Sequence, residues 1–390
     1  MLNILLIILY IAFIAIGLPD SILGSAWPSM YPEFEIDVSC AGIVSFIIAL
    51  GTIISALCAD KLISKFGTGK VTVASIGLST IALFGFSIAS EFWMLCLFAL
   101  PYGMAAGSID SGMNNFAALN FESRHLSWLH CMWGVGTVIG PYVLGYVLAN
   151  DMNWRASYRI LGVIMFVLFL VVLFSLPLWK GSRGGAEGED FTHVPLNKLV
   201  RMPGVKEAMV AFFCYCALEQ TAMLWGSSYM VLEGGVSSET AARLGSLFFI
   251  GITVGRVISG FLTIKLSDDL LIRVGYVVVG IGIVTLLLPF GNMCIYAGLL
   301  LIGFGCAPIY PCTIHATPLH FGTEYSQSVI SIQLASAYTG ICLMPPLFGF
   351  LAGKFGVFLM PFYLAVILAV MVIMHFRVHK AVHPSAESNK

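Results

Sequence analysis

Runs of apolar residues, each about as long as a membrane is thick, recur along almost the whole chain. A helix of roughly 20 apolar residues crosses a bilayer. Only 10% of the 390 residues are charged and 59% are hydrophobic, whereas a typical soluble domain has about 25% charged residues. The sequence therefore predicts an all-α membrane protein with twelve transmembrane helices, at 4–30, 40–58, 71–89, 92–119, 126–149, 156–178, 206–230, 240–263, 271–290, 294–317, 327–352 and 357–376.

The joints between these runs are short, with one exception. Residues 180–204 are polar, glycine-rich and charged, and they divide the twelve spans into two sets of six. We predict an N-terminal six-helix bundle at 1–179, a cytoplasmic central loop at 180–204, a C-terminal six-helix bundle at 205–380 and a cytoplasmic tail at 381–390.

The positions of lysine and arginine predict the orientation in the membrane, because cytoplasmic loops carry an excess of both residues. With the N-terminus inside, fourteen of them fall on the cytoplasmic side and three, Arg155, Arg243 and Lys354, fall outside. The loop "PEFEID" at 32–37 is purely acidic, as expected for an outer loop. Both termini are therefore predicted to be cytoplasmic.

Composition and motifs also exclude several classes of function. The net charge of −1 excludes a strongly basic protein that binds nucleic acid. The ten cysteines lie mostly in apolar runs, and only Cys214 and Cys216 are closely spaced, so we predict no metal site. The chain has no H-E-x-x-H motif and no nucleophile elbow, which argues against a membrane enzyme. We predict no cofactor and, as partners, the lipid bilayer and a small solute.

The two sets of six spans contain similar segments. "GTIISALCADKL" at 51–62 aligns with "GRVISGFLTIKL" at 255–266, and "GPYVLG" at 140–145 aligns with "MPPLFG" at 344–349, both at an offset of 204. A weaker match aligns "GMAAGSID" at 103–110 with "GFGCAPIY" at 303–310. Two parallel six-helix repeats with a substrate site near the midplane are one of the known plans for transporters.

Several motifs resemble those of the major facilitator superfamily. "ADKLISKFGTGK" at 59–70, which contains the helix-end Asp60, is similar to its cytoplasmic loop signature, and "GVGTVIGPYVLG" at 134–145 is similar to its glycine–proline signature. The motifs that resemble the fucose/galactose/glucose–proton symporter branch are "GLPDSILGSAWP" at 17–28, "SIDSGMNN" at 108–115, "YCALEQTAMLWGSSY" at 215–229, "GITVGR" at 251–256 and "GFGCAPIYP" at 303–311. The resemblance implies the major facilitator fold, a monomer in the inner membrane of a bacterium, and a gating role for Asp60.

Few ionisable residues lie well inside the predicted spans, and such residues commonly mark the path of an ion or a substrate. Asp20 follows Pro19 about halfway along the first span. Proline removes a backbone donor, so the helix is expected to kink or break there. By resemblance to the sugar symporters, Asp20 is a candidate for proton coupling. The alternative is a carboxyl group that serves only helix packing.

The fourth span contains a second group of polar residues. Asp110 and Asn114 are four residues apart and therefore share a helix face, and Asn115 follows directly. Carboxamides both donate and accept hydrogen bonds, which suits sugar hydroxyls, so Asn114 and Asn115 are predicted substrate-binding residues. Asp110 is a candidate for proton coupling. Alternatively, Asp110 pairs with Arg256 of the eighth span as an inner gate.

The seventh span combines a carboxylate, an amide and aromatic rings. Glu219 follows Tyr215 by four residues and precedes Gln220, and Trp225 follows one to two turns later. Hydrogen-bonding groups beside aromatic rings are typical of a sugar site. Glu219 is thus a candidate for both proton coupling and substrate binding. The other predicted substrate-binding residues of this span are Tyr215, Gln220 and Trp225. Trp27 of the first span, the rough counterpart of Trp225, is a further predicted binding residue.

Gly140 and Pro141 are predicted to allow close approach and bending of helices, and so to serve gating together with Asp60 and Arg256. The function predicted is secondary active transport of a small polar solute, a hexose or deoxyhexose, by proton-coupled alternating access. The alternatives left open are a proton-coupled exporter of drugs or metabolites, a facilitator without ion coupling, and an integral membrane enzyme or solute sensor.

Overall fold

The chain is helical throughout the part that the structure describes. The structure is a computed structural model that describes residues 2–121, 123–179 and 196–382. Its helices are α1 (Leu2–Asp20), α2 (Ile22–Met30), α3 (Cys40–Phe66), α4 (Thr68–Ile88), α5 (Phe92–Asn120), α6 (Ser123–Ala149), α7 (Arg155–Ser175), α8 (Leu196–Leu199), α9 (Val205–Leu232), α10 (Ser238–Leu262), α11 (Asp268–Leu286), α12 (Asn292–Cys306), α13 (Ile309–Phe321), α14 (Thr323–Phe355) and α15 (Met360–Val382), with 3₁₀ turns at Leu176–Trp179 and Val357–Leu359.

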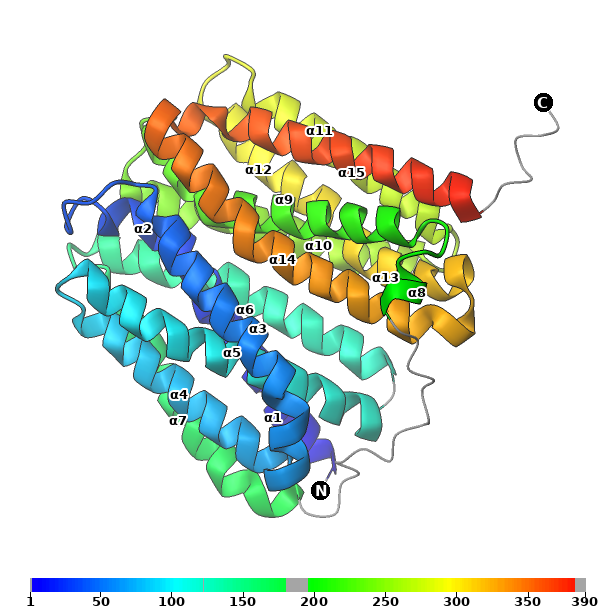
Figure 1. Cartoon of the computed structure of the whole chain (residues 1–390). Helices are drawn as coiled ribbons and strands as arrows, with labels where there is room; N and C mark the ends of the chain where they lie inside the picture. The colour runs from blue at the N-terminus through cyan, green and yellow to red at the C-terminus, as the bar shows by residue number, and fades with distance from the viewer. Residues whose placement is uncertain (1, 122, 180–195, 383–390) are drawn as a thin grey trace. The chain divides into compact units, whose positions relative to one another are not determined.

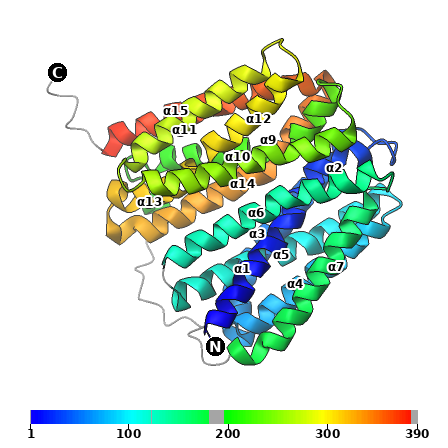
Figure 2. The same ribbon diagram turned by 180° about the vertical axis from the view of Figure 1, so that it is seen from behind.

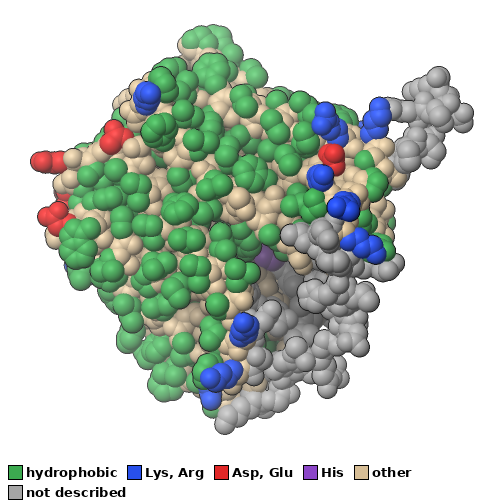
Figure 3. All heavy atoms as spheres, viewed as in Figure 1, with side chains coloured by type: hydrophobic (Ala, Val, Ile, Leu, Met, Phe, Trp, Pro, Cys, Tyr) green, Lys and Arg blue, Asp and Glu red, His purple; other side chains and the backbone are tan. Residues whose placement is uncertain are grey.

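Twelve segments of the described chain are long and apolar enough to cross a membrane, which confirms the predicted number. The first, Ile4–Met30, consists of α1 and α2, and the tenth, Asn292–Phe321, consists of α12 and α13. The other ten each rest on one long helix. Apolar side chains cover most of the visible surface, and only a few charged side chains interrupt it (Figure 3). This distribution is the one expected for helices that are solvated by lipid.

The helices group into two units. The first comprises Met1–Glu187 together with Ser227–Ser246, and the second comprises Gly188–Gly226 together with Leu247–Lys390. The end of α9 and the start of α10 thus belong to the first unit, where Ser227 Oγ donates a hydrogen bond to the carbonyl of Ala241 at 3.3 Å.

In the first unit, α1 lies beside α6, α3 beside α5, and α4 beside α7 (Figures 1 and 2). The α3–α5 pair is in backbone contact because glycines stand at the crossing. A Cβ atom on Gly51 would lie 2.7 Å from the carbonyl oxygen of Leu100, and one on Gly103 would overlap the carbonyl of Ile48. Any larger residue at either position would push the two helices apart.

The second unit repeats this crossing between α10 and α12. A Cβ atom on Gly251 would overlap the carbonyl of Leu300, and one on Gly303 would overlap that of Phe248. These contacts pair Gly251 with Gly51 and Gly303 with Gly103, an offset of 200. The alignment of 51–62 with 255–266 is therefore one helical turn out of register, because apolar helices that contain glycine look similar after such a shift. The weaker match, of 103–110 with 303–310, has the offset that the structure shows.

A network of polar side chains ties the loop after α2 to the start of α7. The carboxylate of Glu33 accepts hydrogen bonds from Asn153 Nδ2 at 3.1 Å and Trp154 Nε1 at 2.6 Å, and it pairs with Arg155. Arg155 Nε also donates to the carbonyl of Ala89 at 2.7 Å. Partial burial acts to raise the pKa of Glu33, but the hydrogen bonds from Arg155, Asn153 and Trp154 together bring it below its ordinary value.

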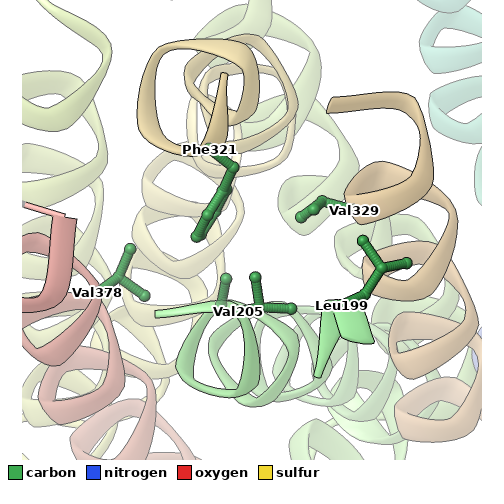
Figure 4. Close-up of a cluster of buried hydrophobic side chains, with 6 residues drawn as sticks. Leu199, Val205, Phe321, Val329 and Val378 are labelled. Atoms are coloured by element: carbon green, nitrogen blue, oxygen red, sulfur yellow. The ribbon is translucent and has the colours of Figure 1, made fainter. Parts of the chain in front are cut away.

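One end of the second unit contains a cluster of buried apolar side chains contributed by α8, α9, α13, α14 and α15 (Figure 4). Its members are Leu199, Val205, Ala208, Phe321, Val329 and Val378. The cluster lies where α9 begins and where α13 and α15 end, so these three helix ends are held together by apolar contacts.

Candidate functional site

The first span is interrupted directly after its carboxylate. Helix α1 ends at Asp20, Ser21 lies in a turn, and α2 begins at Ile22. Pro19 has no backbone N–H and cannot continue the hydrogen-bonding ladder of the helix. The break expected from the Pro19–Asp20 pair is therefore confirmed, and it places Asp20 at a helix end inside a membrane span.

A close crossing of α1 and α6 brings a tryptophan to this break. A Cβ atom on Gly136 would overlap the carbonyl of Ile14, and one on Gly140 would overlap that of Leu18. Because the two backbones touch, side chains on the facing surface of α6 reach α1. Trp133, one turn before Gly136, is placed next to Asp20.

Asp20 accepts two hydrogen bonds from side chains of the first unit. Tyr102 Oη of α5 donates to Oδ1 at 2.7 Å, and Trp133 Nε1 of α6 donates to Oδ2 at 2.9 Å. Within the described residues these are its hydrogen-bonding partners, and both are neutral. These partners hold the carboxyl group in place, and neither would neutralise its charge in the ionised form.

Glu219 lies on α9 in the second unit and has a different environment. Tyr215 Oη, one turn earlier on the same helix, donates to Glu219 Oε1 at 2.9 Å. Arg256 Nη2 of α10 lies 3.8 Å from the same oxygen, and the side chains of both charged residues are 21% exposed. The negative charge of Glu219 is therefore balanced by a cation in its own unit.

The two acids occupy equivalent positions in the two repeats. Gly136 of α6 meets the carbonyl of Ile14 on α1, and Gly340 of α14 meets the carbonyl of Phe213 on α9 in the same way. Asp20 comes six residues after Ile14, and Glu219 comes six residues after Phe213. One repeat position thus carries an acid with neutral partners in the first unit and an acid with a charged partner in the second.

The remaining predicted polar residues fall into two groups. Asn114 on α5 is half-buried in the first unit, and Gln220 on α9 is half-buried in the second. The side chains of Asp60, Asp110 and Asn115 lie outside the described residues.

Both predicted tryptophans are completely buried. Trp27 Nε1 donates to the carbonyl of Val38 at 2.8 Å, and Trp225 Nε1 donates to the carbonyl of Pro345 at 3.1 Å. The ring of Trp225 also packs edge-on against Phe348. Since neither indole has exposed surface and each N–H already has a partner, both contribute to packing within their own unit in this conformation.

Gly140 and Pro141 both lie inside α6, which continues to Ala149. Gly140 has the contact role expected of it, because its missing side chain makes room for the carbonyl of Leu18. Arg256, the other predicted gating residue, lies beside Glu219.

Neither of the two partners of Asp20 was predicted from the sequence. Tyr102 is 82 residues away along the chain and Trp133 is 113 residues away. A usable signal was present for Trp133, because it immediately precedes the glycine–proline motif that begins at Gly134 and crosses α1. Tyr102 follows Pro101 in an apolar run, and no local pattern distinguishes it from an aromatic residue that faces lipid.

Comparison with known proteins agrees with this architecture. The family model described as Major Facilitator Superfamily matches residues 9–242 and 208–390. The glucose/mannose transporter GlcP of Bacillus subtilis is 23% identical over 354 residues, which cover 87% of this chain and 86% of that protein. The 4-hydroxybenzoate transporter PcaK of Pseudomonas putida is 23% identical over 333 residues, covering 74% and 72%.

Solved structures show the same fold. A crystal structure of a mutant of the peptide transporter POT superposes with a TM-score of 0.78 at 13% identity and covers 97% of this chain and 95% of that one. A bacterial homologue of the human lysosomal transporter Spinster superposes with a TM-score of 0.71 over 97% and 95% of the two chains, also at 13% identity. With the twelve apolar spans, the family match over nearly the whole chain shows that this protein is a transporter of the major facilitator superfamily, a multi-pass membrane protein and not an enzyme.

Proposed function

We propose that this protein imports a hexose or deoxyhexose together with a proton, by alternating access. The observation that carries the proposal is the contrast between the two acids at equivalent positions of the repeats. Asp20 is held by neutral donors, and Glu219 is held by a tyrosine and an arginine. Such a contrast is expected if one acid carries the coupling proton while the other belongs to the polar centre that binds the solute.

Asp20 is the proposed coupling residue. When it is ionised, its span carries a net negative charge, and burying such a charge at the centre of a bilayer costs about 3 kcal/mol on insertion scales. A bound proton removes that cost. The carrier with a protonated Asp20 can then reorient more easily than the carrier with a deprotonated Asp20, which links proton binding to transport.

Glu219, Arg256, Tyr215 and Gln220 form the proposed polar centre of the second unit. Asn114 remains a proposed solute-binding residue of the first unit. Carboxylate, guanidinium, hydroxyl and amide groups together offer both donors and acceptors, which suits the several hydroxyls of a sugar. The similarity to a glucose/mannose transporter over most of both chains supports a hexose as the solute.

We also propose that both termini lie in the cytoplasm of a bacterial cell and that the protein works in the inner membrane as a monomer. The basic residues Lys61, Lys65 and Lys70 lie at the end of α3 and the start of α4, and the acidic loop that contains Glu33 and Glu35 lies between α2 and α3. A C-terminal green fluorescent protein fusion should fluoresce, because that protein does not mature after export. A dark fusion that is nevertheless inserted would contradict the orientation.

A whole-cell uptake panel tests the function directly. Cells that express the protein should accumulate labelled glucose, mannose or a deoxyhexose above the external concentration, and a protonophore should abolish the accumulation. Accumulation that resists the protonophore would indicate a facilitator or another coupling ion. Labelled 4-hydroxybenzoate belongs in the panel, since one of the similar proteins bears that substrate in its name. Absence of sugar uptake combined with drug resistance on expression would favour the exporter.

A further inference from the structure

A small cavity lined by both apolar and polar side chains lies in the second unit, next to the tyrosine that holds Glu219. Its volume is about 30 Å³, which exceeds the roughly 10–15 Å³ that a cavity needs to hold a water molecule. Five helices supply its polar lining: Tyr215 from α9, Tyr276 from α11, Thr317 and His320 from α13, Gln333 from α14 and His375 from α15. Ala208, Phe321 and Val378 of the apolar cluster in Figure 4 close it on the side where α9 begins.

His375 is the lining residue that most needs a partner. Its side chain is 7% exposed, and Nε2 finds no hydrogen-bonding group among the described residues. The ring of Tyr276 packs against it edge-on, with centroids 5.3 Å apart, and therefore offers it no hydrogen bond. A buried polar atom without a partner destabilises the folded protein, because it has lost its hydrogen bonds to water. A water molecule in the cavity would remove that cost, and the polar lining supplies the two or more groups that such a water needs.

From the cavity, charged and titratable groups continue to the end of the unit. His320, which lines the cavity, lies 3.6 Å from Asp269 Oδ1 at the start of α11. His379 near the end of α15 lies 3.3 Å from Asp269 Oδ2, and its side chain is 34% exposed. The chain of groups thus begins at a residue in contact with the surroundings of the unit.

At its other end, the cavity reaches Glu219 through one side chain. Tyr215 contributes to the lining and donates its hydroxyl hydrogen bond to Glu219 Oε1. Glu219 itself lies fourteen residues into α9, roughly 20 Å from the first residue of that helix. A carboxylate at that depth needs a path for protons if it is to exchange them with one side of the membrane.

We propose that this cavity is a water-holding proton relay that connects Glu219 with the end of the second unit at which α11 begins and α15 ends. The proton enters at the His320–Asp269–His379 group and reaches His375. The imidazolium of His375 then gives a proton to the cavity water, which passes one of its own to the oxygen of Tyr215 as the tyrosine proton moves to Glu219. One proton moves in total: His375, the water and Tyr215 each end as they were before the proton entered, and the Glu219 carboxylate ends as a carboxylic acid.

The groups that face His375 set its electrostatic environment. They are Asp269, Arg273 and Tyr276 of α11, His320 of α13, His379 of α15, and Tyr215 of α9. Helix α14 contributes the neutral Gln333. The single carboxylate among them, Asp269, lies on the same side as the two outer histidines, so it attracts protons to the entrance of the relay.

The relay goes beyond the proposed function, which assigns the coupling proton to Asp20, and it can be tested without any solute. Purified full-length protein in liposomes is subjected to a rapid drop in pH, and the infrared band of the protonated Glu219 carboxyl is followed in time. The band is assigned by its absence in Glu219→Gln. The variants are His375→Gln and Tyr215→Phe. The matched control is His315→Gln, because His315 is 78% exposed, pairs with Asp268 and does not line the cavity.

We expect the rate at which Glu219 is protonated to fall by about tenfold or more in both relay variants. A positioned side chain that transfers a proton accelerates proton-transfer steps by at least this factor. The control should protonate at the wild-type rate. A wild-type rate in both relay variants overturns the proposal, and so does a Glu219 band that never appears in the wild type. Equilibrium amplitudes, recorded after the transient, distinguish a blocked path from a variant that has altered Glu219 itself. Failure of sugar uptake would leave these rates unchanged and would bear on the proposed function alone.

Discussion

Replacement of Asp20 by asparagine should separate transport from proton coupling. The change removes the charge and keeps the size of the side chain. Trp133 can only donate its N–H, so the amide oxygen must face Trp133, and the amide nitrogen then faces Tyr102, whose hydroxyl can turn to accept. Two charge-assisted hydrogen bonds become two neutral ones, which costs about 1–2 kcal/mol, and removal of the charge from the membrane interior offsets this loss. The variant should therefore fold and insert.

The effect on accumulation follows from the number of protons that Asp20 can carry. One carboxyl group carries one proton, and each unit of pH difference corresponds to about 1.4 kcal/mol, or about tenfold in concentration. Wild-type protein in liposomes should thus accumulate its sugar about tenfold per unit of imposed pH difference. Asp20→Asn should stop at equal concentrations on both sides while it still exchanges labelled for unlabelled sugar.

The assay is uptake of the labelled sugar identified by the cellular panel, with and without a pH gradient, in liposomes that contain equal amounts of protein. Glu91→Gln is the matched control, because Glu91 is an exposed acid at the start of α5 and lies outside any proposed path. Normal gradient-driven accumulation by Asp20→Asn would refute the assignment of Asp20. Loss of exchange as well as accumulation would mean that Asp20 serves the binding or movement of the solute rather than coupling.

Three further predictions concern the two units separately. Arg256→Gln should lower the stability of the protein by roughly 3 kcal/mol, the low end of the range for breaking a buried ion pair, and addition of Glu219→Gln should restore part of it. Melting followed by tryptophan fluorescence measures both effects, and equal melting of all three forms would contradict the pairing. Gly136→Val should force α1 and α6 apart and reduce the yield of monodisperse protein in size-exclusion chromatography, whereas Gly260→Ala, with open space at its Cβ position, should not. Because folding lowers the pKa of Glu33, the ionised carboxylate stabilises the protein fully above the pKa it has in the unfolded chain, and this stabilisation is lost as the pH falls through the pKa it has in the folded protein. The melting temperatures of wild type and Glu33→Gln should therefore converge in acid. A difference that stays constant with pH would show that Glu33 is neutral or unpaired.

The first span shows what a local sequence pattern can predict and what it cannot. Pro19 next to Asp20 in an apolar run predicted a helix break, and the structure has the break between Asp20 and Ile22. The same pattern could not name Tyr102 or Trp133 as partners of the carboxylate, because those contacts depend on how α5 and α6 cross α1. Glu219 and Tyr215 were predictable as a pair, since they lie one turn apart on one helix.

The repeat shows the complementary weakness of sequence comparison. Two segments aligned at an offset of 204, but the crossing glycines place α3 and α10 at an offset of 200. A shift of one helical turn preserves the apolar face, so composition alone does not penalise it. Contact between the two backbones does penalise such a shift. If the glycine stood one turn away from the crossing, a larger residue would occupy the crossing and collide with the neighbouring helix.

The sequence by itself determined that this chain crosses a membrane twelve times, that it has two similar halves, and that it carries acids inside its first and seventh spans. Those properties depend on the hydrophobic length of each segment and on neighbours within a turn or two. Tertiary structure alone decided that the two acids are equivalent in position and different in charge balance, that both tryptophans are buried in packing, and that a polar cavity lies beside Tyr215. These properties depend on which helices touch, and contacts between residues about a hundred positions apart leave no periodic trace along the chain.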